Sequence, residues 1–233
     1  MARKYKWLLF DADNTLLDFS LAEKCALSAT LRGALLPDSD EVVAVYSEIN
    51  DSMWKMLERG EITKERLRTL RFERFCLHFG FTADPVYLAD SYVENLKSNS
   101  QLCEGAEELC QRLFGKYKLY IITNGILEVQ RARFGGSAIC RYFEHSFISD
   151  EIGVEKPSSL FFDAVASAID GFDCKQALVI GDSLSSDIRG GINYGIDTCW
   201  YNPAKKAKPD GMDITYTVER LCDIETLLEG VDE

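Results

Sequence analysis

The stretch Trp7-Leu-Leu-Phe-Asp-Ala-Asp-Asn-Thr15 decides the predicted fold of this chain. It opens with four apolar residues and then at once presents Asp11 and Asp13. A short run without polar residues is typical of a strand that is covered on both faces, as in a parallel sheet. Ligands of open α/β sheets bind beyond the carboxyl ends of the strands. Asp11 and Asp13 therefore occupy a position where such a protein keeps its functional groups.

The rest of the chain supplies more strands of this kind, separated by helical patterns. Further apolar runs predict strands at residues 118–123, 146–148, 177–180 and 197–201. Apolar residues at helical spacing predict helices near residues 105–115, 126–134, 157–170 and 184–194. Because strands and helices alternate, the predicted fold class is α/β, with a doubly wound parallel sheet.

Residues 20–100 contain no run that resembles a strand. Leucines, aromatics and alanines recur there at helical spacing. Pro37 precedes two aspartates and Gly60 precedes Thr63, and these residues are stop and start signals for helices. We read four helices in this stretch. The predicted organisation is a helical-bundle domain at residues 19–100, inserted into an α/β domain made of residues 1–18 and 101–233.

The composition limits what the chain can do. Its 233 residues are 46% hydrophobic, which excludes intrinsic disorder. The 38 acidic residues outnumber the 26 basic ones, so the net charge is -12. This charge argues against a nucleic-acid polymer as partner, because phosphate backbones require a basic face. His78 and His145 are the only two histidines, which disfavours a mechanism built on histidine.

Cysteine spacing and the lengths of apolar runs bear on the expected location. None of the eight cysteines is part of a C-x-x-C pair, and their density is far below that of a disulfide scaffold. The first apolar run stops at Asp11 and is shorter than the roughly 7–15 residues of a signal peptide. No segment approaches the roughly 20 apolar residues of a membrane span. We therefore expect a soluble, cytoplasmic protein with no membrane partner.

Polar groups follow four consecutive predicted strands. Because carboxyl ends of parallel strands meet at one edge of a sheet, we expect these groups to lie close together. Strand by strand they are Asp11 and Asp13; Thr123 and Asn124; Lys156; and Asp182 and Asp187.

This set of groups is suited to phosphate chemistry. Clustered aspartates repel one another unless a cation lies between them, and Mg²⁺ prefers such carboxylate oxygens. Lys156 adds a fixed positive charge, and the Thr123 hydroxyl can donate to a phosphate oxygen. An aspartate can also attack phosphorus and form an aspartyl-phosphate. A second acid two residues further on lies on the same side of an extended backbone and can act as acid and base.

The four groups of residues, Asp11-x-Asp13-x-Thr15, Thr123, Lys156 and Gly181-Asp182-x-x-x-x-Asp187, resemble the four motifs of the haloacid dehalogenase superfamily in order. The resemblance covers nearly the whole chain, including a helical cap inserted after the first motif. It implies a phosphohydrolase with Asp11 as nucleophile and Asp13 as acid and base. It further implies phosphate binding by Thr123, Asn124 and Lys156, and Mg²⁺ binding by the Asp11 carboxylate, the Asp13 carbonyl and Asp182. Asp187 is implied as a helper, either near the metal through water or orienting Lys156.

A narrower resemblance concerns the substrate. Asp11-Ala-Asp-Asn-Thr-Leu-Leu-Asp-Phe19, Ile122-Thr-Asn-Gly125 and the cap stretches 48–54, 60–63 and 71–72 are similar to the noncanonical pyrimidine 5′-nucleotidase branch. That branch dephosphorylates nucleoside monophosphates. The resemblance implies a small phosphorylated metabolite as substrate, and a role in specificity for the cap residues Asn50, Trp54 and Arg71.

Simpler interpretations exist for each residue alone. Asp11 and Asp13 could be turn acids, and Asp187 could be a favourable charge in the first turn of a helix capped by Ser183. Lys156 could mark a helix start, with Pro157 in the first helical position. Their joint placement at one sheet edge favours the catalytic interpretation.

Other functions remain open at this level. A 2-haloacid dehalogenase would use Asp11 without a metal, but it would need neither Asp13 nor Asp182. A receiver-like phosphoacceptor module has similar residues but is much shorter and lacks an inserted cap. A phosphomutase shares the same core groups, and sugar phosphates or N-acylneuraminate phosphate are the alternative phosphatase substrates. A monomer and a homodimer are both compatible with the sequence.

Overall fold

The computed structural model describes residues 4–231, so that residues 1–3 and 232–233 of the predicted α/β domain lie outside it. The chain divides into two compact units. The core unit comprises Met1–Asp18, Leu102–Leu127 and Phe134–Glu233, and the helical unit comprises Phe19–Gln101 and Glu128–Arg133. The segment Glu128–Arg133 lies within the range predicted for the α/β domain. Its first residue, however, forms ion pairs with Arg68 and Lys97 of the helical unit, at 3.3 and 2.6 Å.

The core unit is built on a six-stranded sheet in the order β3-β2-β1-β4-β5-β6, and every pairing is parallel. At its centre, Phe10 of β1 is aligned with Ile121 of β2 and Ile180 of β4. This arrangement confirms the predicted doubly wound α/β fold. The strands are β1 (Trp7–Phe10), β2 (Lys118–Thr123), β3 (His145–Ile148), β4 (Ala177–Gly181), β5 (Asp197–Tyr201) and β6 (Tyr216–Val218).

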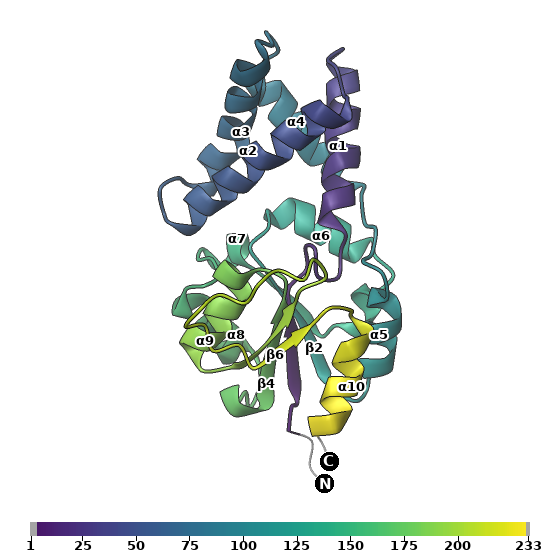
Figure 1. The fold of residues 1–233 in the computed structure, drawn as a ribbon, viewed down its shortest axis with the longest axis vertical. Coiled ribbons are helices and arrows are strands. Elements are labelled where there is room, and N and C mark those ends of the chain that lie inside the picture. Colours follow the sequence, from purple (N-terminus) through teal and green to yellow (C-terminus); the bar gives the residue numbers. More distant parts are fainter. Residues whose placement is uncertain (1–3, 232–233) are drawn as a thin grey trace. The chain divides into compact units, whose positions relative to one another are not determined.

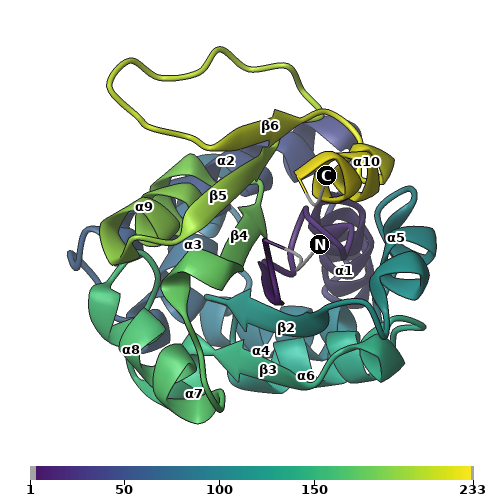
Figure 2. The same ribbon diagram turned by 90° about the horizontal axis from the view of Figure 1, so that it is seen from below.

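Both faces of the sheet are covered by helices, which explains why β1 is apolar throughout. Successive side chains of a strand point to opposite faces. Leu8 and Phe10 join a buried cluster with α5 (Ala106–Leu113) and α10 (Cys222–Val231), and Trp7 and Leu9 join a second cluster with α8 (Ser159–Ala168). Figure 2 shows α5 and α10 on one side of the sheet and α8 and α9 (Arg189–Tyr194) on the other.

The helical unit confirms the four predicted helices (Figure 1). Three of them begin at a side chain that accepts a hydrogen bond from a free backbone N–H, namely Ser39, Thr63 and Asp84. Their buried faces meet in an aromatic cluster of Tyr46, Phe72, Phe75 and Tyr92. The helices are α1 (Phe19–Gly33), α2 (Asp40–Glu58), α3 (Lys64–Phe79) and α4 (Pro85–Lys97).

Several elements of the core unit differ from the sequence-based expectation. Neither β6 nor α10 was predicted. The strand β6 has three residues and lies at the edge of the sheet, so it is too short to show a period. Residues 184–188 form a π-helical turn, η3 (Leu184–Ile188), ahead of α9. In this turn the N–H of Ile188 donates to the carbonyl of Ser183, five residues earlier, at 3.1 Å. Such turns insert an extra residue and are frequent at functional sites.

The remaining short elements connect the sheet to its helices. Helix α6 (Leu127–Gly135) is divided between the two units. All eight cysteines are free, but only Cys76, Cys110 and Cys199 are buried. Within residues 4–231, every helix is too short or too polar to cross a bilayer. The other short helices are α7 (Ser149–Ile152), η1 (Cys140–Tyr142) and η2 (Cys174–Gln176).

Candidate active site

Asp11 stands at the carboxyl end of β1, on a tight turn. Its N–H donates to Ile180 of β4 at 2.8 Å, which extends the sheet ladder by one residue. The chain then reverses at Asn14, a residue that tolerates the left-handed conformation it adopts here, with φ of 59°. This turn brings the Thr15 hydroxyl to 3.3 Å from Asp11 Oδ2. Asp11 is buried, with 7% of its surface exposed.

Lys156 provides the positive charge beside Asp11. Its Nζ donates to Asp11 Oδ1 at 2.8 Å, to Asp187 Oδ1 at 2.6 Å and to the carbonyl of Ile122 at 2.7 Å. These three acceptors satisfy all three N–H groups of the ammonium. The side chain is completely enclosed, with 1% exposed. A lysine can be buried in this way only because two carboxylates compensate for its lost hydration.

The backbone of Lys156 is held by the side chain of Asn124. The Asn124 amide donates to the Lys156 carbonyl at 2.9 Å, and its oxygen accepts from the Lys156 N–H at 2.8 Å. The sequence indicated Asn124 as a phosphate ligand, and that role stays a prediction. The neighbouring Thr123 is buried, and its hydroxyl accepts from the Gly125 N–H at 3.2 Å.

Pro157 does not start the following helix. Helix α8 begins at Ser159 and is capped by the Ser158 hydroxyl, which accepts from Leu160 N–H at 3.3 Å. The interpretation of Lys156 as a mere helix-start signal is therefore wrong.

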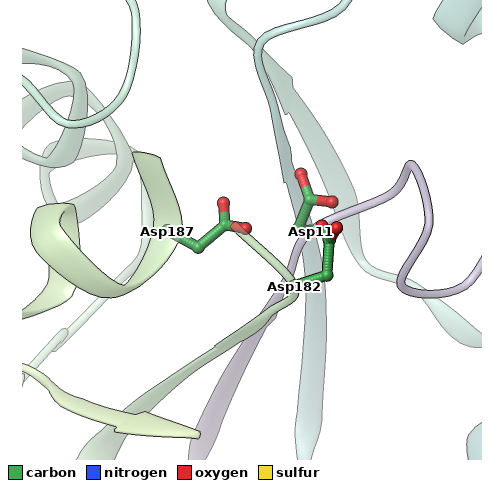
Figure 3. Close-up of side chains that lie close together, drawn as sticks. All are labelled: Asp11, Asp182 and Asp187. Atoms are coloured by element: carbon green, nitrogen blue, oxygen red, sulfur yellow. The ribbon is translucent and has the colours of Figure 1, made fainter. Parts of the chain in front are cut away.

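Asp187 lies on η3, and its carboxylate points toward Asp11 and Asp182 (Figure 3). One of its carboxylate oxygens accepts from Lys156, and the other accepts from the Ser183 N–H at 3.1 Å. A Cβ on Gly181 would lie 2.2 Å from Asp187 Oδ2, so only glycine leaves room for this carboxylate. Ser183 does cap the turn, as predicted, but Asp187 is fully buried and is more than a helix-end charge.

Three carboxylates converge at this edge of the sheet. Oxygens of Asp11, Asp182 and Asp187 lie within 4.8 Å of one another (Figure 3). Lys156 is bonded to two of them, Asp11 and Asp187, so these three carboxylates and this ammonium, when ionised, carry two negative charges, three minus one. The donor set, carboxylate oxygens with an excess charge of two, fits a hard divalent cation such as Mg²⁺. Asp13, which is half-buried, is the fourth predicted acid of the site.

The pKa values of Asp11 and Asp182 are raised partly by this repulsion between the carboxylates. Burial, followed by the charge of Asp187, raises the pKa of Asp11 well above its ordinary value. The same two causes raise the pKa of Asp182 to about 7. For Lys156, burial alone would lower the pKa, but the charges of Asp11 and Asp187 outweigh it and the pKa is raised. Without a bound cation, the proximity of the carboxylates thus disfavours their ionised forms, whereas the lysine stays charged.

Removal of one carboxylate should therefore stabilise the metal-free protein. The pKa of Asp182 rises from 3.8 to about 7 on folding, so the stability of the metal-free protein falls as the pH rises through that window. We expect Asp182→Asn to raise the thermal midpoint at pH 8 by several degrees, with a smaller gain at pH 5, in calorimetry with EDTA.

Asp210→Asn, on an exposed loop, is the matched control and should behave like the wild type at both pH values. Excess Mg²⁺ should cancel the advantage of Asp182→Asn, because the wild type alone would retain the full ligand set. A gain that is equal at both pH values would contradict the electrostatic explanation.

The predicted cap residues lie in the helical unit. Arg71 Nη1 donates to Asn50 Oδ1 at 3.1 Å, and Asn50 Nδ2 donates to Glu23 Oε1 at 2.7 Å, so that a buried polar chain joins α3, α2 and α1. The Arg71 guanidinium lies 4.7 Å from the centre of the Tyr92 ring. Trp54 is half-buried on α2. A role of Asn50, Trp54 and Arg71 in specificity stays a prediction.

Sequence reasoning assigned no role to three residues that hold these groups in place. Thr15 contacts both Asp11 and the Asp182 backbone, Trp200 contacts the Asp182 carbonyl, and Glu23 ends the polar chain in the helical unit. Trp200 could have been suspected, since it lies near the carboxyl end of the fifth predicted strand. No local sequence signal marks Glu23.

Comparisons with known proteins agree with this geometry. Residues 5–195 match the family model of the haloacid dehalogenase-like hydrolases. The chain is 39% identical to the pyrimidine 5′-nucleotidase PynA of Streptococcus pneumoniae over 97% of this chain and 95% of the relative. It is 32% identical to the pyrimidine 5′-nucleotidase YjjG of Escherichia coli, over 97% and 98% of the two chains.

A solved structure extends the likeness to the whole fold. The HAD-hydrolase YfnB of Bacillus subtilis, crystallised with magnesium, superposes with a TM-score of 0.92 at 34% identity. The superposition covers 97% of this chain and 99% of that one. On the family model and on relatives of this similarity and coverage, the chain belongs to the haloacid dehalogenase-like hydrolase family.

Proposed function

We propose that this hydrolase is a Mg²⁺-dependent phosphomonoesterase that acts through an aspartyl-phosphate and takes pyrimidine nucleoside monophosphates as substrates. The observation that carries the proposal is the buried contact of Lys156 with Asp11, beside a carboxylate cluster at the carboxyl ends of parallel strands. A fixed ammonium next to a carboxylate nucleophile is what phosphoryl transfer requires, because negative charge on the phosphoryl oxygens must be offset.

The proposed reaction has two steps. In the first, an Asp11 carboxylate oxygen attacks phosphorus, the ester P–O bond breaks, and Asp13 donates a proton to the departing alcohol. In the second, Asp13 takes a proton from water as the water oxygen attacks phosphorus, which releases phosphate and restores Asp11. Lys156 holds Asp11 in place and offsets charge in both steps, while Thr123 donates to a phosphate oxygen.

The residues at the site fit Mg²⁺, whose charge would offset that of the phosphoryl oxygens when bound. We assign its binding to the Asp11 and Asp182 carboxylates and the Asp13 carbonyl. Asp187 has both oxygens engaged, by Lys156 and by the Ser183 N–H, and therefore acts by orienting Lys156. This supports the second of the two roles that the sequence left open for Asp187.

The relatives support the proposed substrate class. PynA and YjjG, which match nearly the full chain at 39% and 32% identity, are both named pyrimidine 5′-nucleotidases. A shared fold alone would not justify assigning the relatives' substrate class to this chain, since one fold supports many chemistries. Two relatives that match over the helical unit as well as the core make it the strongest proposal for this chain.

A substrate screen tests this function. We expect kcat/KM for UMP, dTMP and CMP, measured with Mg²⁺ by phosphate release, to exceed the values for sugar phosphates, phosphoglycolate and N-acylneuraminate 9-phosphate by at least about tenfold. If no pyrimidine nucleotide ranks near the top, the nucleotidase assignment fails while the phosphatase assignment stands. Dechlorination of 2-chloropropionate in the presence of EDTA would contradict both.

A further inference from the structure

Trp200 is a buried residue near the carboxyl end of β5, at the edge of the sheet where the site lies. The proposed chemistry gives it no role. It lies on β5, next to β4, and 2% of its surface is exposed. It belongs to a buried apolar cluster with Ile188 of the η3 turn and with Met212 and Ile214 of the loop after β5. The indole Nε1–H donates to the backbone carbonyl of Asp182 at 3.0 Å. Because the ring is buried in this cluster, the position of its N–H donor is restrained.

The Asp182 backbone is also held from its other side. Its N–H donates to the Thr15 hydroxyl at 3.1 Å, and the same hydroxyl lies 3.3 Å from Asp11 Oδ2, to which it can donate. Thr15 is fully buried. Thr15 therefore ties Asp182 to Asp11, and Trp200 ties it to β5. The main-chain N–H and C=O of Asp182 are thus bound by two side chains, one from the turn after β1 and one from β5.

Asp182 needs such support because charge repulsion acts on its carboxylate. Its carboxylate lies within 4.8 Å of those of Asp11 and Asp187, which favours movement apart. The preceding residue, Gly181, is the last residue of β4 and pairs with Trp200 of β5. The two hydrogen bonds to the Asp182 backbone continue this support one residue beyond the strand and counter the repulsion.

We propose that Trp200 and Thr15 are positioning residues that hold the Asp182 carboxylate in its metal-binding place, Trp200 acting through the Asp182 carbonyl. The inference rests on the proposed metal site but not on the proposed substrate. Groups that orient metal ligands affect affinity strongly, and their loss weakens metal binding by about 10–100-fold.

The test is Mg²⁺ binding by calorimetric titration without substrate. Trp200→Phe keeps an aromatic ring and removes the N–H donor, and we expect its Kd for Mg²⁺ to rise by about 10–100-fold. The matched control is Trp7→Phe, since Trp7 is equally buried, with 2% exposed, but lies at the amino end of β1. We expect its Kd to stay within about twofold of the wild-type value. Circular dichroism of each variant with EDTA checks that the fold is retained.

Thr15 gives an independent pair of variants. Thr15→Val removes the hydroxyl at constant shape and should weaken Mg²⁺ binding, whereas Thr15→Ser keeps the hydroxyl and should restore most of it. Tryptophan fluorescence supplies a second readout, since the indole that contacts Asp182 should respond to the ion. We expect Mg²⁺ to change the emission of the wild type and of Trp7→Phe, and to leave that of Trp200→Phe unchanged.

Some results would overturn the inference. They are a Trp200→Phe variant that binds Mg²⁺ as tightly as the wild type, a Trp7→Phe variant that loses as much affinity, or a wild type that binds no Mg²⁺. A failed nucleotide screen would leave these binding results intact, so the two proposals can fail separately.

Discussion

Asp11→Asn should abolish phosphatase turnover, with kcat reduced by at least about 10⁴-fold, the scale of loss when a nucleophile is removed. An amide does not attack phosphorus, but Asn has nearly the same shape as Asp. Its Oδ1 can still accept the hydrogen bond that Lys156 Nζ makes to Asp11 at 2.8 Å. The loss should therefore be chemical and not structural. Phosphate release from UMP and from p-nitrophenyl phosphate measures it.

Two controls make this result decisive. Asp11→Asn removes one charge from a crowded cluster, so its thermal midpoint with EDTA should equal or exceed that of the wild type. Asp210→Asn makes the same chemical change on an exposed loop and should keep full activity. Activity within tenfold of the wild type in a folded Asp11→Asn variant would refute the nucleophile assignment.

Lys156→Met should have the largest effect on stability. Methionine keeps the apolar stem but leaves the buried carboxylates of Asp11 and Asp187 without their shared cation. Breaking a buried ion pair in this way costs about 3–5 kcal/mol. In a chain of this size, such a loss lowers the thermal midpoint by roughly 6–20 °C. Activity should fall by at least about 10²-fold, because the ammonium that holds Asp11 and offsets charge in both proposed steps is lost.

The stability loss in Lys156→Met should depend on pH. Burial and the charge of Asp187 raise the pKa of Asp11, and without the ammonium nothing from Lys156 opposes this shift, so Asp11 can relieve its cost by taking a proton. The urea midpoint of Lys156→Met should therefore approach that of the wild type near pH 5 and depart furthest from it at pH 8. Lys118→Met is the control, since Lys118 pairs with Glu144 on the surface at 2.5 Å and should leave the urea midpoint unchanged. Equal losses in the two variants would contradict the role given to burial.

The amino-acid sequence was sufficient to predict the core architecture and the edge at which the functional groups gather. The runs at residues 7–10 and 177–180 are wholly apolar, and those at 118–123 and 197–201 largely so, because both faces of the sheet are covered, and burial on both faces leaves a local signal. The rule that parallel strands present their carboxyl ends at one edge then brings Asp11, Lys156 and Asp182 together without a structure. Short elements such as β6 (Tyr216–Val218) leave no such signal.

The tertiary structure alone decided how these groups are held. Lys156 and Asp11 are 145 positions apart in the chain, and Thr15 and Asp182 are 167 apart. Whether such residues touch depends on the register of neighbouring strands and on the packing of the loops between them. The contacts of Asn124 with the Lys156 backbone, of Asp187 with Lys156, and of Trp200 with Asp182 arise in the same way. Local patterns report burial and backbone preference within a few residues, whereas hydrogen bonds between distant side chains exist only once the sheet has formed.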